Sequence, residues 1–135
     1  MLTMQTRQLV PMISVVDVER SIAFYQHLGF EIGNTFAPEG GTKPAWAWLY
    51  CDHAQLMLSP AAKPVVAEPQ SVLFYLYTDD VTAARASLVE AGLNPGEIRT
   101  EFYAPRGEFE LVDPDGYILM ITHTAKPVTT LLQKP

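Results

Sequence analysis

The sequence is short of cysteine and of positive charge. Cys51 is the single cysteine among 135 residues, so the chain can form neither an internal disulfide nor a zinc site built from several thiolates. Nine lysines and arginines stand against fifteen acidic residues, which gives a formal net charge of −6. A polyanion would be repelled by this charge, so we expect no nucleic acid and no membrane among the partners.

Long apolar runs are also missing. No segment approaches the roughly 20 apolar residues of a membrane span, and the first residues contain no apolar run long enough for a secretory signal. We therefore expect a cytoplasmic protein. With 48% apolar and 18% charged residues, the chain has the composition of one ordinary globular domain, which needs neither metal nor disulfide to hold it together.

Two segments of the chain repeat at a spacing of 63 residues. Each begins with an aspartate suited to cap a helix, Asp17 or Asp80, and ends at a glycine suited to terminate one, Gly29 or Gly92. The offsets agree, since 80 − 17 = 63 and 92 − 29 = 63. The repeat predicts two helices, near residues 17–28 and 80–91.

Strand patterns flank both predicted helices. An apolar extended run precedes each helix, at 9–16 and at 72–78, and a hairpin follows in each half. The first hairpin turns at Asp52, and the second turns at 113–116, where a left-handed glycine ends a type I turn. Each half therefore contains a strand, a helix and two or three further strands. We place these modules at about 9–59 and 71–124, joined by a proline-containing linker at 60–70.

Alternation along the strands sorts the side chains of the first hairpin into two faces. With a two-residue turn after Cys51, Leu49 lies opposite Leu56 on one face and Trp48 opposite Met57 on the other. The leucine face belongs under the helix. The opposite face is an aromatic row that includes Trp46, Trp48, Tyr50, Gln55 and Met57.

The same rule applies to the second half. The expected helix side holds Phe74, Leu76, Phe109, Leu111, Leu119 and Ile121. The opposite side holds Leu73, Tyr75, Tyr77, Glu108, Glu110, Val112, Ile118 and Met120. A carboxylate among such apolar neighbours calls for a partner. Glu108 and Glu110 are either solvated charges at the rim or carboxylates that meet a cationic group, and Glu110 has the better position in the alternation to face the cup.

Two motifs resemble those of a known family. PMISVVDVERSIAFYQHLGFEI and RGEFELVDPDGYILMIT are together similar to the vicinal oxygen chelate superfamily, which includes glyoxalase I, extradiol dioxygenases and bleomycin-resistance proteins. The similarity spans about residues 9–124, and Pro11 with the short linker and the closing motif most resembles the bleomycin-resistance group. The resemblance implies an α+β fold of paired βαβββ modules whose curled sheets form a cup, usually in a dimer.

The resemblance also implies where a metal would bind. Enzymes of the superfamily hold a divalent metal on His or Gln and on Glu, and the matching positions here are Val10, Met57, Leu73 and Met120. Two thioethers and two aliphatic side chains cannot bind zinc, iron or manganese. We therefore expect no metal, no other cofactor and no catalytic residue.

The sequence then predicts a metal-free protein that binds a small organic molecule, cationic or aromatic, such as an antibiotic that it sequesters. The predicted ligand-binding residues are Trp46, Trp48, Tyr50, Met57, Tyr75, Tyr77, Glu110 and Met120. One alternative is a glyoxalase-like lyase or dioxygenase with non-standard metal ligands or acid–base residues. Another is a structural relic whose aromatic side chains fill the cup or a dimer interface. We expect a homodimer, because each module leaves a sheet edge and an apolar face exposed.

Overall fold

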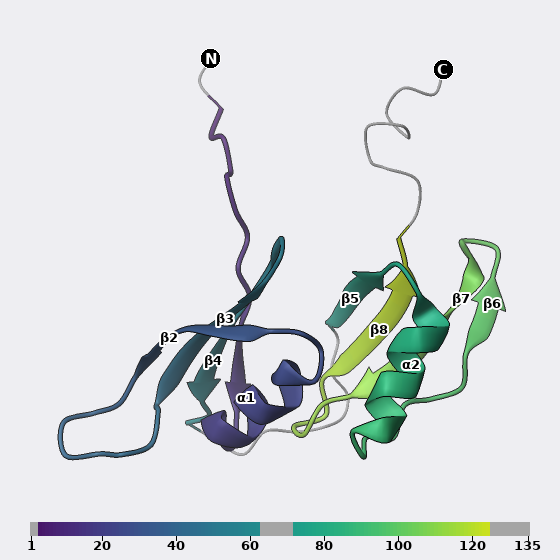
Figure 1. Cartoon of the computed structure of the whole chain (residues 1–135). Coiled ribbons are helices and arrows are strands. Elements are labelled where there is room, and N and C mark those ends of the chain that lie inside the picture. The colour runs from purple at the N-terminus through teal and green to yellow at the C-terminus, as the bar shows by residue number, and fades with distance from the viewer. Residues whose placement is uncertain (1–2, 63–71, 125–135) are drawn as a thin grey trace. The chain divides into compact units, whose positions relative to one another are not determined.

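The computed structural model describes residues 3–62 and 72–124. The chain divides into two compact units, residues 1–65 and 66–135, and each holds one helix and four strands (Figure 1). The first unit contains β1 (Met12–Val15), α1 (Val18–Gln26), β2 (Glu31–Phe36), β3 (Trp46–Cys51) and β4 (Ala54–Pro60). The second contains β5 (Leu73–Thr78), α2 (Val81–Glu90), β6 (Arg99–Glu101), β7 (Ala104–Val112) and β8 (Ile118–His123). This confirms the predicted α+β fold of two βαβββ modules. The cup and the exact module bounds stay predictions.

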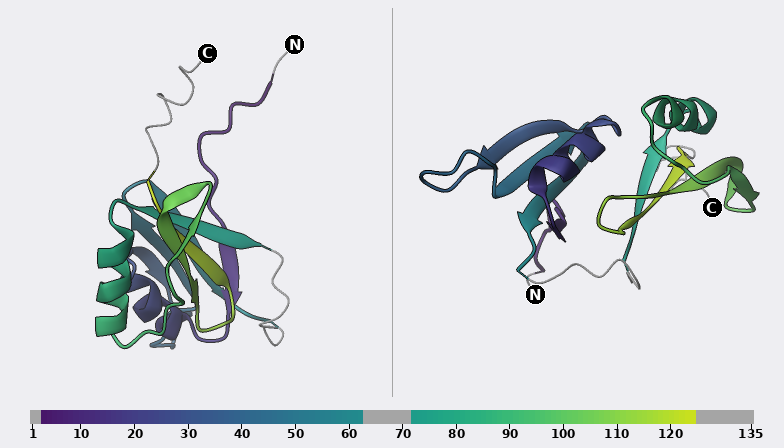
Figure 2. Two further views of the ribbon diagram at one scale, coloured as in Figure 1. Left: turned by 90° about the vertical axis from the view of Figure 1, so that its right-hand side faces the viewer. Right: turned by 90° about the horizontal axis from the view of Figure 1, so that it is seen from below.

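Each unit forms one four-stranded sheet, in the order β1-β4-β3-β2 or β5-β8-β7-β6. The first strand of each unit runs parallel to the last, and the other neighbours are antiparallel. Met12 lies opposite Met57, and 63 residues later Tyr75 lies opposite Met120. The repeat therefore extends to the pairing register of the strands. In each unit the helix lies along one face of its own sheet (Figure 2).

Both helices begin and end close to the predicted residues. The carboxylate of Asp17 accepts a hydrogen bond from a backbone N–H three residues later at 3.1 Å, and that of Asp80 does the same at 3.0 Å. Gly29 and Gly92 follow the helices with φ of +93° and +88°, the left-handed conformation that ends a helix. Within the described residues, neither helix is long and apolar enough to cross a membrane.

Each core lies between a helix and the sheet face beneath it. The first hairpin pairs as predicted, with Leu49 opposite Leu56 and Trp48 opposite Met57. Leu49 is fully buried, at 0% exposure. The helix-side residues Phe109, Leu111, Leu119 and Ile121 of the second hairpin are buried too. Phe74 and Leu76, also predicted on the helix side, are half-buried, and their neighbours on β5 are exposed or half-buried.

The first strand is shorter than the predicted run at 9–16. Pro11 has no N–H to donate to the sheet, so the ladder begins at Met12, although the Pro11 carbonyl still accepts a hydrogen bond from Met57 at 2.9 Å. The preceding residues run as an extended segment on which Leu9 is exposed (Figure 1). At the other end of the unit, β4 continues through Pro60, one residue into the predicted linker. The rest of that linker after residue 62, and the tail after residue 124, lie outside the described residues.

The assignment of the two faces can be tested by paired substitutions on β3. Leu49→Ala should lower the free energy of unfolding by about 2–5 kcal/mol, because it opens a cavity in the core. Tyr50→Ala should cost no more than about 1 kcal/mol, because Tyr50 lies on the other face with 38% of its surface exposed. Urea unfolding of both variants measures the difference. Equal costs would show that the two faces have been assigned wrongly.

Candidate functional site

The face of the first sheet turned away from α1 carries the predicted aromatic row, and we call it the aromatic face. Its predicted members are Trp46, Trp48, Tyr50, Gln55 and Met57, and all of them alternate with the buried residues of β3 and β4. The ring centroids of Trp48 and Tyr50 lie 6.0 Å apart, with the ring planes tilted by 35°. Trp46 and Trp48 are half-buried, so each indole is held by the sheet and still presents surface outward. The face offers a flat ligand two adjacent rings to stack on.

Hydrogen bonds fix the orientation of Trp48. Its indole Nε1 donates to Oε1 of Gln55 at 3.1 Å, and Nε2 of Gln55 donates to Oε1 of Gln8 at 3.1 Å. The direction of the first bond is set because an indole N–H can only donate. Sequence reasoning placed Gln55 on this face but gave it no role. The sequence does contain a signal for this role, because Gln55 is a lone amide side chain within an apolar strand.

A glycine lets the Trp48 ring lie close to the neighbouring strand. The pairing of β2 with β3 shifts between Ile32 and Asn34, which leaves Gly33 as the extra residue of a β-bulge. A Cβ atom at Gly33 would lie only 2.6 Å from Cε3 of Trp48. Beyond the bulge, Phe36 pairs with Trp46 and is exposed. Sequence analysis missed both residues, because the bulge interrupts the alternation of β2.

The face of the second sheet turned away from α2 has a different chemistry, and we call it the acidic face. It holds the predicted residues Tyr75, Tyr77, Glu110 and Met120 together with Glu108. One row across the sheet is Tyr75, Met120 and Glu110, and the next is Tyr77, Thr122, Glu108 and Arg99. The ring centroids of Tyr75 and Tyr77 lie 6.5 Å apart, and both rings are exposed.

Equivalent positions of the two sheets carry different side chains. Trp48 lies opposite Met57 in the first unit, and Glu110 lies opposite Met120 in the second. The spacing along this strand is 110 − 48 = 62, because the second hairpin has a longer turn. Two residues earlier on the same two strands, Trp46 corresponds in the same way to Glu108, since 108 − 46 = 62. One face therefore offers ring stacking where the other offers negative charge.

Glu108 is the buried carboxylate of the acidic face. Only 5% of its surface is exposed, and its Oε2 accepts a hydrogen bond from the hydroxyl of Tyr103 at 2.8 Å. Its Oε1 is buried and has no hydrogen-bond partner among the described residues. Sequence analysis favoured Glu110, which is exposed. Alternation could not separate the two glutamates, because both lie on the same face of β7 and differ in burial.

The carboxylate of Glu108 also changes the acidity of Tyr103. The hydrogen bond stabilises the protonated phenol, and with smaller contributions from desolvation and nearby charge it raises the pKa of Tyr103 from 10.0 to about 12. The phenol therefore stays protonated at neutral pH and remains a hydrogen-bond donor to Glu108.

The positions that the family resemblance assigns to a metal do not fit one. Met57 and Met120 supply thioethers, while Val10 and Leu73 are aliphatic, and none of these is a ligand that zinc or iron prefers. Among residues 3–62 and 72–124, no group of three or more His, Cys, Asp and Glu side chains could hold a metal ion.

The histidines have other surroundings. His123 is buried, its Nε2 accepts a hydrogen bond from the backbone N–H of Arg106 at 3.1 Å, and its Nδ1 lies 3.1 Å from the carbonyl oxygen of Thr124. His53 is exposed in the turn of the first hairpin, and His27 caps the C-terminus of α1.

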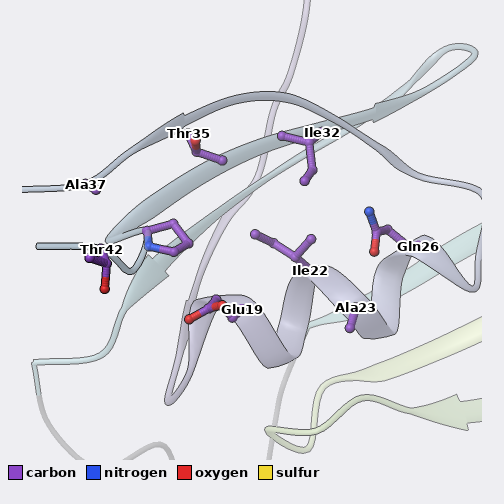
Figure 3. Close-up of a pocket in the computed structure, with 9 residues that line it drawn as sticks. Glu19, Ile22, Ala23, Gln26, Ile32, Thr35, Ala37 and Thr42 are labelled. Carbon is purple, nitrogen blue, oxygen red and sulfur yellow. The ribbon is translucent and has the colours of Figure 1, made fainter.

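A cavity of about 370 Å³ lies on the helix side of the first sheet, between α1 and β2 (Figure 3). Its walls combine Ile22 and Gln26 of α1 with Ile32 and Thr35 of β2. The sequence did not predict this cavity.

Comparison with known proteins gives a family and a set of similar folds. The sequence profile of the Glyoxalase/Bleomycin resistance protein/Dioxygenase superfamily matches residues 7–121. A bleomycin resistance determinant encoded on the transposon Tn5 has a TM-score of 0.71 at 20% identity, covering 88% of this chain and 98% of that one. A bleomycin-binding protein complexed with bleomycin has a TM-score of 0.70 at 20% identity, covering 89% and 100%. TnmS3, an antibiotic-binding protein from Streptomyces sp. CB03234, has a TM-score of 0.71 at 23% identity, covering 91% and 100%.

A short stretch is also similar to a viral protein. It is 37% identical over 62 residues to the major viral transcription factor ICP4 homolog of Varicella-zoster virus (strain Dumas), and it covers 44% of this chain. The chain spans about 5% of the length of that curated relative. The activity and partners of the viral protein are therefore not transferred to this chain.

The role of Gly33 can be tested by adding one methyl group. Gly33→Ala should displace the Trp48 ring and shift the tryptophan emission and the near-ultraviolet circular dichroism, because the new Cβ would overlap the indole. Thr35→Ala, two residues away on the helix side of β2, is the matched control and should leave both spectra unchanged. Identical spectra for Gly33→Ala and the wild type would contradict the close approach.

The Tyr103–Glu108 contact predicts a pH dependence. The phenol should titrate near pH 12, and Glu108→Gln should move its pKa back toward 10. Because the pKa is raised in the folded state, this contribution to stability is complete below pH 10 and is lost as the pH rises through 12. The carbon chemical shift of the Tyr103 ring, followed by NMR against pH, measures both values. A wild-type pKa near 10 would rule out the contact.

Proposed function

We infer the function of this chain from its family and its surfaces: it belongs to the glyoxalase/bleomycin resistance/dioxygenase superfamily. We propose that it binds a small organic molecule on the aromatic face, without a metal and without chemical conversion. The observation that supports this proposal most strongly is the placement of the Trp48 ring. Gly33 and Gln55 hold its ring in one orientation, and the ring is still half-exposed. An anchor that is ordered before the ligand arrives loses little conformational entropy on binding.

The composition of the face favours a flat ligand, and cationic ligands above neutral ones. Indole rings attract both flat rings and cations, and the thioether of Met57 adds a polarisable wall. The net charge of −6 would speed the approach of a cation. The bleomycin-binding and antibiotic-binding proteins of the same fold support an antibiotic as the ligand, which this chain would sequester.

The proposed ligand-binding residues lie on both faces. The aromatic face contributes Trp46, Trp48, Tyr50 and Met57, and the acidic face contributes Tyr75, Tyr77, Glu110 and Met120. Glu110 is exposed, so water screens its charge and its proposed role is to attract a cation rather than to hold it.

An enzymatic function is the alternative that the sequence left open. A lyase or dioxygenase of the usual kind needs metal ligands, and the side chains at the four family positions are poor donors. For acid–base chemistry the sequence suggested Glu110 with Tyr75 or Tyr77. The phenol that hydrogen-bonds to a carboxylate is instead Tyr103, and with a pKa of about 12 it is a poor base at neutral pH.

Two further features belong to the proposal. All six residues of the edge strand β2 are exposed, and pairing with a second copy would cover such an edge, which favours a homodimer. The sequence features that led us to expect a cytoplasmic protein also favour that location.

Tryptophan fluorescence tests the proposal, because Trp46 and Trp48 are the only tryptophans and both lie on the aromatic face. Bleomycin should quench the emission. Trp48→Ala should weaken binding by about 2–4 kcal/mol, the cost typical of removing an aromatic anchor. Val89→Ala, an exposed position on α2, is the control and should bind as the wild type does.

The same titration tests the absence of a metal. Dialysis against a chelator should leave the affinity unchanged. Loss of binding after chelation would overturn the metal-free part of the proposal. Absence of quenching by bleomycin and by a panel of planar cations, or an unchanged affinity in Trp48→Ala, would overturn the proposed site.

A further inference from the structure

The acidic face contains a buried charge that the proposed stacking site does not use. The carboxylate of Glu108 is 95% buried, since 5% of the residue is exposed, and its Oε1 has no partner among the described residues. A buried polar atom without a hydrogen bond is costly, and a carboxylate oxygen is more costly than most. Such an atom in a folded protein calls for an explanation, and a ligand that donates to it is one.

The basic residues nearest in the strand register do not neutralise Glu108. Arg99 is its cross-strand neighbour, yet the described residues show no ion pair between them within 4.0 Å. Arg106, two residues before Glu108 on β7, is directed to another group: its Nη2 lies 3.0 Å from Nδ1 of His123 and also donates to the carbonyl of Thr124. Neither arginine therefore pairs with the carboxylate of Glu108.

The surroundings define which cation would fit. Tyr77 lies in the same row as Glu108, and Tyr75 is close enough to Tyr103 to affect its pKa. Phenol rings at these positions favour a cation over a neutral group. The unpaired oxygen adds a second requirement, because it needs a donor hydrogen. Primary ammonium, guanidinium and amidinium groups meet both requirements, whereas a quaternary ammonium meets only the first.

We propose that Glu108, positioned by Tyr103, anchors a hydrogen-bond-donating cationic group of a ligand on the acidic face. The inference rests on the proposed binding function and names the chemical class of one ligand group. Tyr103 occupies Oε2 and leaves Oε1 to the ligand. It belongs to the turn between β6 and β7, where it is 54% exposed and its neighbour Phe102 is 95% exposed.

NMR titration with benzylammonium tests the anchor. The backbone amide signals of residues 107–109 should shift on binding, and Glu108→Gln should weaken the affinity at least tenfold. Glu101→Gln removes the same charge from an exposed position on β6 and should change the affinity less than twofold. Binding of benzylammonium to Glu108→Gln with the wild-type affinity would overturn the proposal.

A second experiment compares two probes on the wild-type protein, so its result does not depend on whether a variant folds. Benzyltrimethylammonium keeps the ring and the charge but has no N–H, so it should bind at least fivefold more weakly than benzylammonium. Equal affinities would show that Glu108 does not accept a hydrogen bond from the ligand and would overturn the proposal.

The two proposals can fail separately. Quenching of Trp46 and Trp48 by bleomycin reports on the aromatic face, whereas the amides of residues 107–109 report on the acidic face. Quenching without a Glu108-dependent response to benzylammonium rejects the anchor alone. A Glu108-dependent response without quenching rejects the proposed stacking site alone.

Discussion

A single helix covers only one face of each four-stranded sheet, and this constraint determines the rest of the molecule. Strand alternation sends every second side chain into the core beneath the helix and the others to the opposite face. Leu49 and Leu58 are fully buried for this reason, while Trp48 lies between them in register and turns the other way. The side chains on this opposite face are not part of the core beneath the helix.

The two open faces have diverged while the framework has stayed the same. The parallel ladders match at a spacing of 63 residues, and the helices are capped by equivalent aspartates. Yet the positions of Trp46 and Trp48 in one sheet correspond to Glu108 and Glu110 in the other. The first sheet therefore offers a ring-stacking surface, and the second offers an acidic surface that is rich in tyrosine.

The framework could be predicted from sequence because it depends on short-range regularities. The capping aspartates, the terminal glycines and the two-residue turn after Cys51 fix the helices and the register of the first hairpin. The features that sequence analysis missed depend on departures from regularity. The bulge at Gly33 breaks the alternation that would have placed Phe36. The hydrogen bond from Tyr103 to Glu108 crosses the turn between β6 and β7, and strand alternation does not describe a turn residue. The cavity beside α1 likewise reflects unfilled space, which a pattern of side chains does not reveal.

We propose that the ligand stacks on the face carrying Trp48 and not in the cavity on the helix side. Intermolecular nuclear Overhauser effects between bleomycin and the protein locate the ligand directly. We expect contacts from the flat rings of the ligand to the indole protons of Trp48 and to the methyl group of Met57. Contacts confined to Ile22 and Ile32, which line the cavity between α1 and β2, would contradict it.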